Sequence, residues 1–378
     1  MKHRRGNNEG SIYRRKDGTW CGAVSSGRDR EGNPIRKYVY GKTRQEVSNK
    51  LVKLLQDYQV GLLPTQGKKV TFGQWLWTYL NLYKKPQIRE TTYELYSNIL
   101  KNHLPTYLAS LPLEKVRPED LQRLFLEKEG RTMQILRNFI HGALKQAMRL
   151  GYVPRNVAEA TTPPRNKKKE VQVLSREDIK KFIASSQDHR LFPAFFLLLT
   201  TGLRRGELLG LQWSDVDLER GTITVSRSLI YLKGKFIFQE PKTKGSSRTI
   251  PLPEVTQEVL KEWKRKWLEE RMALGANWPK TDLVFPTEVH TPINPRNFGR
   301  TFKDLLKKAE LSPTITIHGL RHTYATLLLS AGEHPKVVQE LLGHSSITIT
   351  MDTYSKVAPG LKEKAVEKLN AILNNGSR

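Results

Sequence analysis

The sequence predicts a multidomain protein that is mainly α-helical and contains small β-sheets. Its 378 residues are more than twice the roughly 150 residues of an average domain. Strand-like patterns with turn residues are confined to residues 9–40 and 223–252, and apolar residues at helical spacing fill much of the remainder. Two aperiodic stretches rich in proline, glycine or lysine divide the chain. We therefore expect domains at 1–60, 70–163 and 173–378, joined by a linker at 61–69 and a basic linker at 164–172.

The charge balance indicates a polyanionic partner. The chain contains 64 Lys and Arg against 37 Asp and Glu, which gives a formal net charge of +27 and a pI near 10.0. Nucleic acid is the densest polyanion available to a protein inside a cell. We therefore favour a nucleic-acid partner over an anionic membrane surface or a basic surface without a dedicated partner.

Several classes of protein are disfavoured by what the sequence lacks. The longest apolar stretch, residues 191–203, is shorter than the ~20 residues of a membrane-spanning helix. The first residues form no apolar signal segment. The single cysteine, Cys21, allows neither an intrachain disulfide nor a cysteine-rich zinc module. We expect a cytoplasmic protein that does not associate with a membrane.

The first domain is predicted as a three-stranded sheet with one helix across its back. Residues 11–15, 20–25 and 35–40 alternate like strands, and Asp17-Gly18 favours a tight hairpin between the first two. Thr43 and Glu46 form a capping box before apolar residues at helical spacing. Through residue 60 the chain has fourteen basic and six acidic residues, a net charge of +8.

The open face of such a sheet is a candidate DNA-binding surface. We expect it to carry basic side chains beside Tyr13 and Tyr38, since cations and aromatic rings suit phosphate and groove contacts. The alternative is a solvated sheet edge protected by charge. The basic residues assigned to this face are Arg14, Arg15, Lys16, Arg36 and Lys37.

The second domain is predicted to contain four helices. They cover residues 71–83, residues 91–104 after a capping box of Thr91 and Glu94, a segment that Pro118 begins, and residues 131–150. The apolar side of the last helix is assigned to Ile135, Phe139, Ala143, Ala147 and Leu150. The opposite side carries Arg131, Arg137, Lys145 and Arg149, and the linker adds Lys167, Lys168 and Lys169. Both basic sets are candidate phosphate contacts, although such a helix face is as often only solvated.

The third domain is predicted to be helical with a small inserted sheet. Ser175 and Asp178 form a capping box at its first helix. Residues 223–227, 236–238 and 248–252 read as three strands, and helical patterns resume afterwards.

The stretch T-G-L-R-R-G-E-L at 201–208 places Arg204 in the first turn of a helix. A helix N-terminus already favours anions, so an arginine there suits phosphate binding, with Glu207 holding the guanidinium. A surface Arg–Glu pair is the alternative.

The stretch H-G-L-R-H-T at 318–323 places His318 and Arg321 on one helical face. His318 and His322 have the spacing of a zinc-binding pair, but Gly319 stands where a metalloprotease needs its glutamate, so we expect no metal site. Taken singly, His344, Tyr354 and the turn lysines Lys242 and Lys244 have ordinary structural explanations.

Together these motifs are more specific than any one of them. The order Arg, Lys, His-x-x-Arg, His, Tyr, carried by T-G-L-R-x-x-E-L, H-x-L-R-H-T, L-G-H-S-S and D-T-Y-S, resembles the tyrosine recombinases, or phage integrase family, over about residues 173–365. The resemblance implies a mixed α/β catalytic domain of the tyrosine recombinase type. The implied catalytic residues are Arg204, Lys242, His318, Arg321, His344 and the nucleophile Tyr354. Upstream, 70–163 is similar to the family's core-site-binding domain, and 1–60 resembles its arm-site-binding domain.

The resemblance also implies the reaction. An integrase of this type cleaves and rejoins double-stranded DNA through a 3′-phosphotyrosyl intermediate, without metal or cofactor, to integrate and excise a prophage or other mobile element. Lys242 or its rival Lys244 would protonate the leaving oxygen. The implied partners are core and arm attachment sites and three further copies in a tetramer, with an excision factor or DNA-bending protein as a further candidate. A predicted helix over 359–373 either covers its own domain or docks on a neighbouring copy.

Two other functions stay open from the sequence alone. One is a DNA-binding regulator with the same fold that has lost its chemistry, which the complete set of six residues argues against. The other is a type IB topoisomerase, which the arm-like N-terminal domain disfavours.

Overall fold

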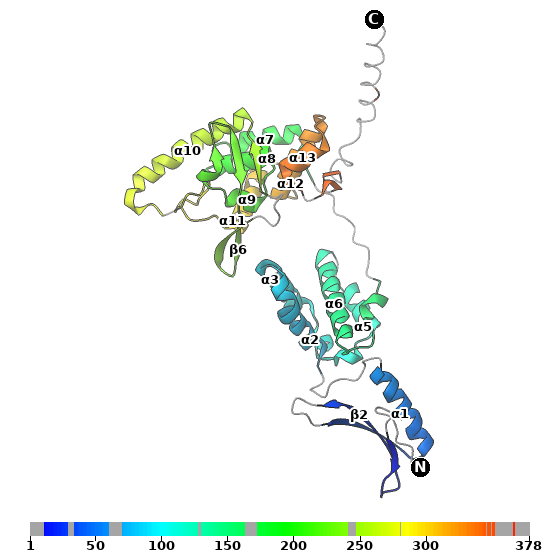
Figure 1. Cartoon of the computed structure of the whole chain (residues 1–378). Coiled ribbons are helices and arrows are strands. Elements are labelled where there is room, and N and C mark those ends of the chain that lie inside the picture. Colours follow the sequence, from blue (N-terminus) through cyan, green and yellow to red (C-terminus); the bar gives the residue numbers. More distant parts are fainter. Residues whose placement is uncertain are drawn as a thin grey trace. The chain divides into compact units, whose positions relative to one another are not determined.

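A computed structural model describes the chain as two compact units, Met1–Lys168 and Lys169–Arg378 (Figure 1). It is mainly helical with small antiparallel sheets, as predicted. No helix within the described residues is both long enough and apolar enough to cross a membrane. The residues described are 11–28, 34–59, 70–127, 130–162, 172–240, 247–279, 281–344, 346–348, 350–351 and 366.

The first unit begins with the predicted antiparallel sheet. β1 (Ser11–Arg14), β2 (Trp20–Arg28) and β3 (Pro34–Gly41) lie in that order, and α1 (Arg44–Gln59) packs on one face. Gly22 lies where α1 approaches the sheet closely, because a Cβ there would lie 2.9 to 3.2 Å from the side chains of Val39, Val47 and Leu51. Thr43 Oγ1 accepts from Glu46 N–H at 3.1 Å, as the predicted cap requires, but the Glu46 carboxylate accepts from Lys42 N–H.

The strand register corrects the predicted basic face. Tyr13, Cys21 and Tyr40 are direct cross-strand partners, so Tyr13, Tyr38 and Tyr40 share the open face, with Arg36 two residues along. Arg14 is paired with Trp20, two residues before Gly22, and this register position belongs to the face that meets α1. Lys16 lies in the turn, and the Arg15 guanidinium lies 5.5 Å from the centre of the Tyr40 ring. The five basic residues therefore do not share one surface.

The helical part of the first unit has one more helix than predicted. It contains α2 (Phe72–Thr78), which continues as a wider π-type turn at Tyr79–Lys84, then α3 (Glu90–His103), α4 (Thr106–Ser110), α5 (Pro118–Leu126) and α6 (Arg131–Arg149). The short α4 was not predicted. The predicted capping box is wrong, because Arg89 is the N-cap residue of α3 and Thr91 lies inside its first turn.

The buried side of α6 is also rotated from the prediction. Leu150 is exposed and Ile135 only partly buried, because stepping by four residues drifts around a helix of 3.6 residues per turn. Arg131, Lys145 and Arg149 are exposed as predicted, whereas Arg137 is half-buried. The fully buried residues are Met133, Leu136, Phe139, Ile140, Ala143, Leu144 and Ala147.

The second unit is built around one apolar helix. α8 (Phe192–Thr201) contacts α7 (Arg176–Ser186), α10 (Glu254–Leu274) and α12 (Ile317–Ser330). Its Phe195 ring stacks on Phe298 of α11 (Pro295–Lys308), with ring centres 4.5 Å apart. Two shorter α-helices of the described part of this unit are α9 (Arg205–Leu209) and α13 (Pro335–Leu342).

The strands of this unit form two sheets instead of the predicted one. β4 (Val216–Asp217), β5 (Thr222–Val225) and β8 (Arg248–Pro251) pair in one sheet, and β6 (Ser228–Leu232) pairs only with β7 (Lys235–Gln239). Lys233 and Gly234 both have positive φ, which is the conformation of a two-residue hairpin turn. The prediction missed β4 and β6 because β4 has two residues and β6 follows β5 after only two more.

Candidate active site

The turn between α8 and α9 places Arg204. Gly202 ends α8 in the left-handed conformation with φ of 63°, and a Cβ there would lie 2.6 Å from Leu342 and Tyr324 atoms. Arg204 has extended backbone angles and is the N-cap residue of α9. The turn at Gly202 and Leu203 therefore places Arg204 at the start of α9.

Glu207 joins two arginines. Its Oε2 accepts from the Arg204 backbone N–H at 2.9 Å, and its Oε1 accepts from Arg204 Nη1 at 2.7 Å. Arg248 Nη2 donates to Oε2 at 2.9 Å and Nη1 to Oε1 at 3.3 Å. Burial alone raises the pKa of Glu207, but the hydrogen bonds and charges of Arg248 and Arg204 outweigh burial and lower it. This is a buried, shared carboxylate and not the surface ion pair of the alternative interpretation.

Helix α12 contributes His318 and Arg321. Arg321 Nη1 donates to the Gly202 carbonyl at 2.7 Å and Nη2 to the Leu342 carbonyl at 2.6 Å. Burial, with the nearby Arg204 charge, lowers the pKa of Arg321 to about 9, so the guanidinium stays charged at pH 7. Desolvation and the charges of Arg321 and Arg204 lower the pKa of His318, which leaves its imidazole neutral at pH 7.

The end of α13 positions His344. Gly343 ends the helix with φ of 64°, and the next backbone N–H, that of His344, donates to the Gln339 carbonyl at 3.1 Å. His344 Nδ1 lies 2.9 Å from Thr350 Oγ1. Burial and the charges of Arg321 and Arg204 lower the pKa of His344 to about 3. This imidazole is therefore also neutral at pH 7.

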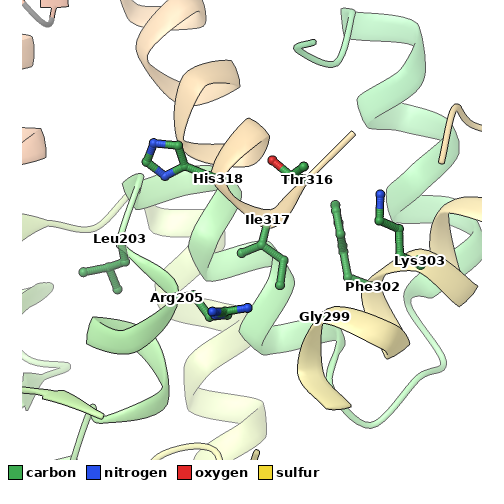
Figure 2. A pocket seen from close by; sticks show the side chains of 8 residues that line it. All are labelled: Leu203, Arg205, Gly299, Phe302, Lys303, Thr316, Ile317 and His318. Atoms are coloured by element: carbon green, nitrogen blue, oxygen red, sulfur yellow. The ribbon is translucent and has the colours of Figure 1, made fainter. Parts of the chain in front are cut away.

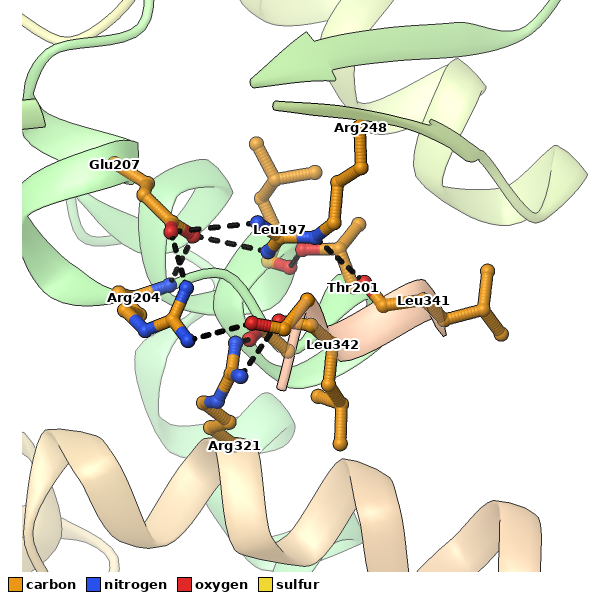
Figure 3. Close-up of polar contacts among 10 residues, drawn as sticks. Leu197, Thr201, Arg204, Glu207, Arg248, Arg321, Leu341 and Leu342 are labelled. Carbon is orange, nitrogen blue, oxygen red and sulfur yellow. Dashed lines mark hydrogen bonds and ion pairs between the residues drawn. The ribbon is translucent and has the colours of Figure 1, made fainter. Parts of the chain in front are cut away.

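The structure brings four predicted residues together: Arg204, His318, Arg321 and His344 lie close enough for their charges to shift one another's pKa values. Lys242, Lys244 and Tyr354 lie outside the described residues, as do Lys167, Lys168, Lys169 and all of the predicted helix over 359–373 except Val366. Arg248 was not predicted as a site residue. It is the first residue of a strand, and nothing in the local sequence indicates that its side chain contacts the end of α13 (Figure 3).

A pocket of about 400 Å³ adjoins the cluster (Figure 2). Its walls come from α9, α11 and the start of α12, and His318 lines it. Arg205 and Lys303 contribute positive charge, and no carboxylate is among its lining residues. The pocket therefore suits an anionic group beside the cluster. The complete lining is Leu203, Arg205, Gly299, Phe302, Lys303, Thr316, Ile317 and His318.

Two histidines of α12 lie side by side but form no metal cluster. The rings of His318 and His322 meet edge to face with centres 4.8 Å apart. Within the described part of the chain, no group of three or more His, Cys, Asp or Glu is arranged to hold a metal ion.

Residues 169–360 match the model of the Phage integrase family, and residues 71–128 match that of the Phage integrase, N-terminal SAM-like domain. The first match covers half of the chain and includes the whole cluster. The chain belongs to the phage integrase family. A Tyrosine recombinase XerC-like protein of Caldanaerobacter subterraneus is 35% identical over 92% of this integrase and 95% of its own length. The ICEBs1 integrase of Bacillus subtilis is 28% identical over 96% and 100% of the two chains.

Solved structures share the fold of the integrase. The Tn1549 transposon integrase in complex with a circular intermediate DNA superposes with a TM-score of 0.69, at 22% identity over 80% of this chain and 99% of its own. A lambda integrase tetramer bound to a Holliday junction gives a TM-score of 0.59, at 20% identity over 94% and 98% of the two chains. The integrase is thus a tyrosine site-specific recombinase, and its partner is DNA.

Proposed function

We propose that the integrase cleaves and rejoins DNA at attachment sites through Tyr354. The Tyr354 hydroxyl attacks the scissile phosphorus, a bond forms between its oxygen and the 3′ phosphate, and the bond to the 5′ oxygen breaks. A neutral imidazole, His318 or His344, takes the tyrosine proton, and Lys242 gives a proton to the departing 5′ oxygen. When the 5′ hydroxyl of another strand attacks the phosphotyrosyl bond, the reaction runs in reverse, Tyr354 is released and the cleaved strand is joined to a new partner.

The charge of the cluster is the observation that supports this proposal. Negative charge gathers on the phosphoryl oxygens in the transition state and has to be neutralised. Arg204 and Arg321 supply two guanidinium groups within one cluster, and the side chain of Arg204 remains 39% exposed to solvent. His318 and His344 are neutral at pH 7, as proton acceptance from a tyrosine requires. A protein that only binds DNA would not need two neutral imidazoles beside two arginines.

We assign the other parts of the chain to DNA recognition and assembly. Residues 70–163 bind the core site and 1–60 bind arm sites, with the exposed Arg36 of the sheet and Arg131, Lys145 and Arg149 of α6 as phosphate contacts. Lys167, Lys168 and Lys169 are further candidate contacts to DNA phosphates. Four copies act on two duplexes, as the lambda integrase tetramer on a Holliday junction suggests. The biological task is integration and excision of a mobile element in the cytoplasm, with an excision factor or DNA-bending protein as a candidate aid.

A nicked DNA substrate that carries the attachment site tests the reaction. The nick lets the short product diffuse away, so the covalent protein–DNA adduct accumulates and is read on a denaturing gel. Wild type is expected to form the adduct and Tyr354→Phe to form none. Absence of adduct with wild type, or its persistence in the variant, would contradict the proposal and favour an idle DNA-binding regulator.

Four further variants separate the assigned roles. Arg204→Ala should bind DNA but cleave it at least a hundredfold more slowly, because one phosphate donor is lost. A substrate whose leaving 5′ oxygen is replaced by sulfur needs no proton donor. It should restore cleavage to Lys242→Ala if Lys242 is the general acid, and to Lys244→Ala if Lys244 has that role. Deleting residues 1–60 should leave core-site cleavage intact and reduce recombination.

A further inference from the structure

Three arginines from three elements hold the end of α13 (Figure 3). The Leu341 carbonyl accepts a hydrogen bond from Arg248 Nε at 2.7 Å, the Leu342 carbonyl from Arg321 Nη2 at 2.6 Å, and the Gly343 carbonyl from Arg204 Nη2 at 2.9 Å. The last carbonyls of a helix have no partner within it. Here three successive carbonyls each receive a charged donor, immediately before His344.

Arg248 is oriented into the protein. It begins β8, its side chain is only 7% exposed, and Nε, Nη1 and Nη2 all donate to Leu341 or Glu207. Arg204 differs, because its side chain is 39% exposed and one of its Nη groups extends to Gly343. Arg248 is therefore placed to hold other groups, whereas Arg204 is also accessible to a substrate.

Arg248 contacts groups that adjoin two catalytic candidates, Arg204 and His344. Through Glu207 it is linked to both the backbone and the guanidinium of Arg204. Through Leu341 it fixes the turn that leads to His344, and its side chain packs against Gly343, where a Cβ would lie 3.1 Å from Arg248 Cδ and Nη1. A shift of Arg248 would move Arg204 and His344 relative to each other.

We propose that Arg248 is a positioning residue that sets the geometry of Arg204 and His344 without contacting the DNA. This inference rests on the proposed roles of those two residues. A buried Arg–Glu pair is a poor source of stability, because apolar residues of similar volume often do as well. Geometric control of the site gives a physical reason for a charged pair at this position.

The first measurement does not depend on cleavage. The pKa of His344 is measured by NMR on the full chain with labelled histidine, in wild type, Arg248→Met and Arg248→Lys. If Arg248 holds His344 near Arg321 and Arg204, its loss lets the pKa of His344 rise toward its ordinary value of 6.5. Arg248→Lys, which retains the charge and one or two hydrogen bonds, should give an intermediate rise.

A matched control removes another paired arginine of the same unit. Arg227 Nη2 lies 3.3 Å from Asp215 Oδ1, with a side chain 27% exposed, between β5 and β6 and outside the cluster. Arg227→Met should lower the melting temperature, because the buried Asp215 carboxylate loses a charged partner, yet leave the pKa of His344 unchanged. An equal rise in the pKa of His344 in both variants would overturn the proposal, since the effect would then be a general loss of stability.

The second measurement is single-turnover adduct formation on the nicked substrate at saturating DNA, well below the melting temperature. Arg248→Met should cleave about tenfold to a hundredfold more slowly, as misplacement by about 1 Å does elsewhere. Arg248→Lys should recover part of the rate, and DNA affinity should change less than about threefold. If Arg248→Met does not fold, Arg248→Lys carries both measurements alone.

The outcomes separate this inference from the proposed reaction. If Arg248→Met raises the pKa of His344 but the wild-type integrase forms no adduct, the proposed reaction is overturned and the positioning role remains. An unchanged pKa with cleavage within twofold of Arg227→Met would overturn the positioning role and leave the reaction in place.

Discussion

Replacement of Glu207 by glutamine is the perturbation that most directly tests the charge arrangement of the site. The carboxylate accepts four hydrogen bonds, two from Arg204 and two from Arg248. Glutamine has one acceptor oxygen, and its NH₂ group would face donors. Two guanidinium groups would then share a buried site without a counter-charge, and Arg248 is almost wholly covered.

The expected loss of stability follows from that burial. Removing one partner of a buried ion pair costs about 3 to 5 kcal/mol, because the remaining charge stays buried. For a unit of this size each kcal/mol lowers the melting temperature by about 2 to 4 °C, so a decrease of roughly 6 to 20 °C is expected. Cleavage should fall as well, since the Arg204 backbone and guanidinium lose their common acceptor.

Calorimetry of the full chain measures the change, with Glu262→Gln as the matched control. Glu262 pairs with Lys266 at 3.2 Å on the exposed surface of α10, and such pairs are worth at most about 1 kcal/mol. The pKa of Glu207 lies below its ordinary value of 4.5, so the carboxylate stabilises the fold above pH 4.5 and this contribution is lost as the pH falls further. The difference in melting temperature between Glu207→Gln and wild type should therefore shrink as the pH falls below 4.5. Equal melting temperatures for the two variants at pH 7 would refute the reasoning.

Three other changes have defined outcomes. Gly343→Ala should slow adduct formation at least tenfold, because φ is 64° and the new Cβ would lie 3.1 Å from the buried side chain of Arg248. A rate within twofold of wild type would show that the turn tolerates a side chain. Burial and the charges of Arg321 and Arg204 lower the pKa of His344 to about 3, so this imidazole stays neutral as the pH falls from 8 to 6, and the lowered pKa of His318 lies below its ordinary value of 6.5. Single-turnover cleavage at subsaturating DNA should therefore show no decline centred at pH 6.5, and such a decline would contradict both shifts. Arg205→Ala or Lys303→Ala should reduce the salt dependence of DNA binding by about one unit of slope if the pocket receives a backbone phosphate, and an unchanged slope would argue against that use.

The sequence predicted the parts of the site that local spacing encodes. His318 and Arg321 are three residues apart on one helix, and Arg204 and Glu207 span one cap, so each pair is set by a single turn. The contact of Arg248 with Leu341 joins residues 93 positions apart, and no local pattern encodes such a distance. The predicted basic face of the first sheet is wrong for a related reason. Alternation along the strand and the cross-strand register place Arg14 on the side of the sheet that meets α1, and neither is encoded by the basic residues themselves.

The same distinction applies to the strands and helix ends. β5 and β8 were predicted because they alternate and are flanked by turn residues, whereas β6 follows too closely to read as a separate strand. The start of α3 was displaced because Thr91 and Glu94 resemble a cap, although the chain already turns at Arg89. Ser175 gave the correct start of α7, where its side chain accepts from Asp178 N–H.

The three arginines bind α13 through main-chain carbonyls, and a main-chain carbonyl is present whatever the side chain. Substitutions at exposed positions of this helix, such as Val337, therefore leave the arginine contacts available. A substitution on the outer surface of α13 should therefore disturb the site less than a change at Glu207 or at one of the three arginines, which make these contacts through their side chains.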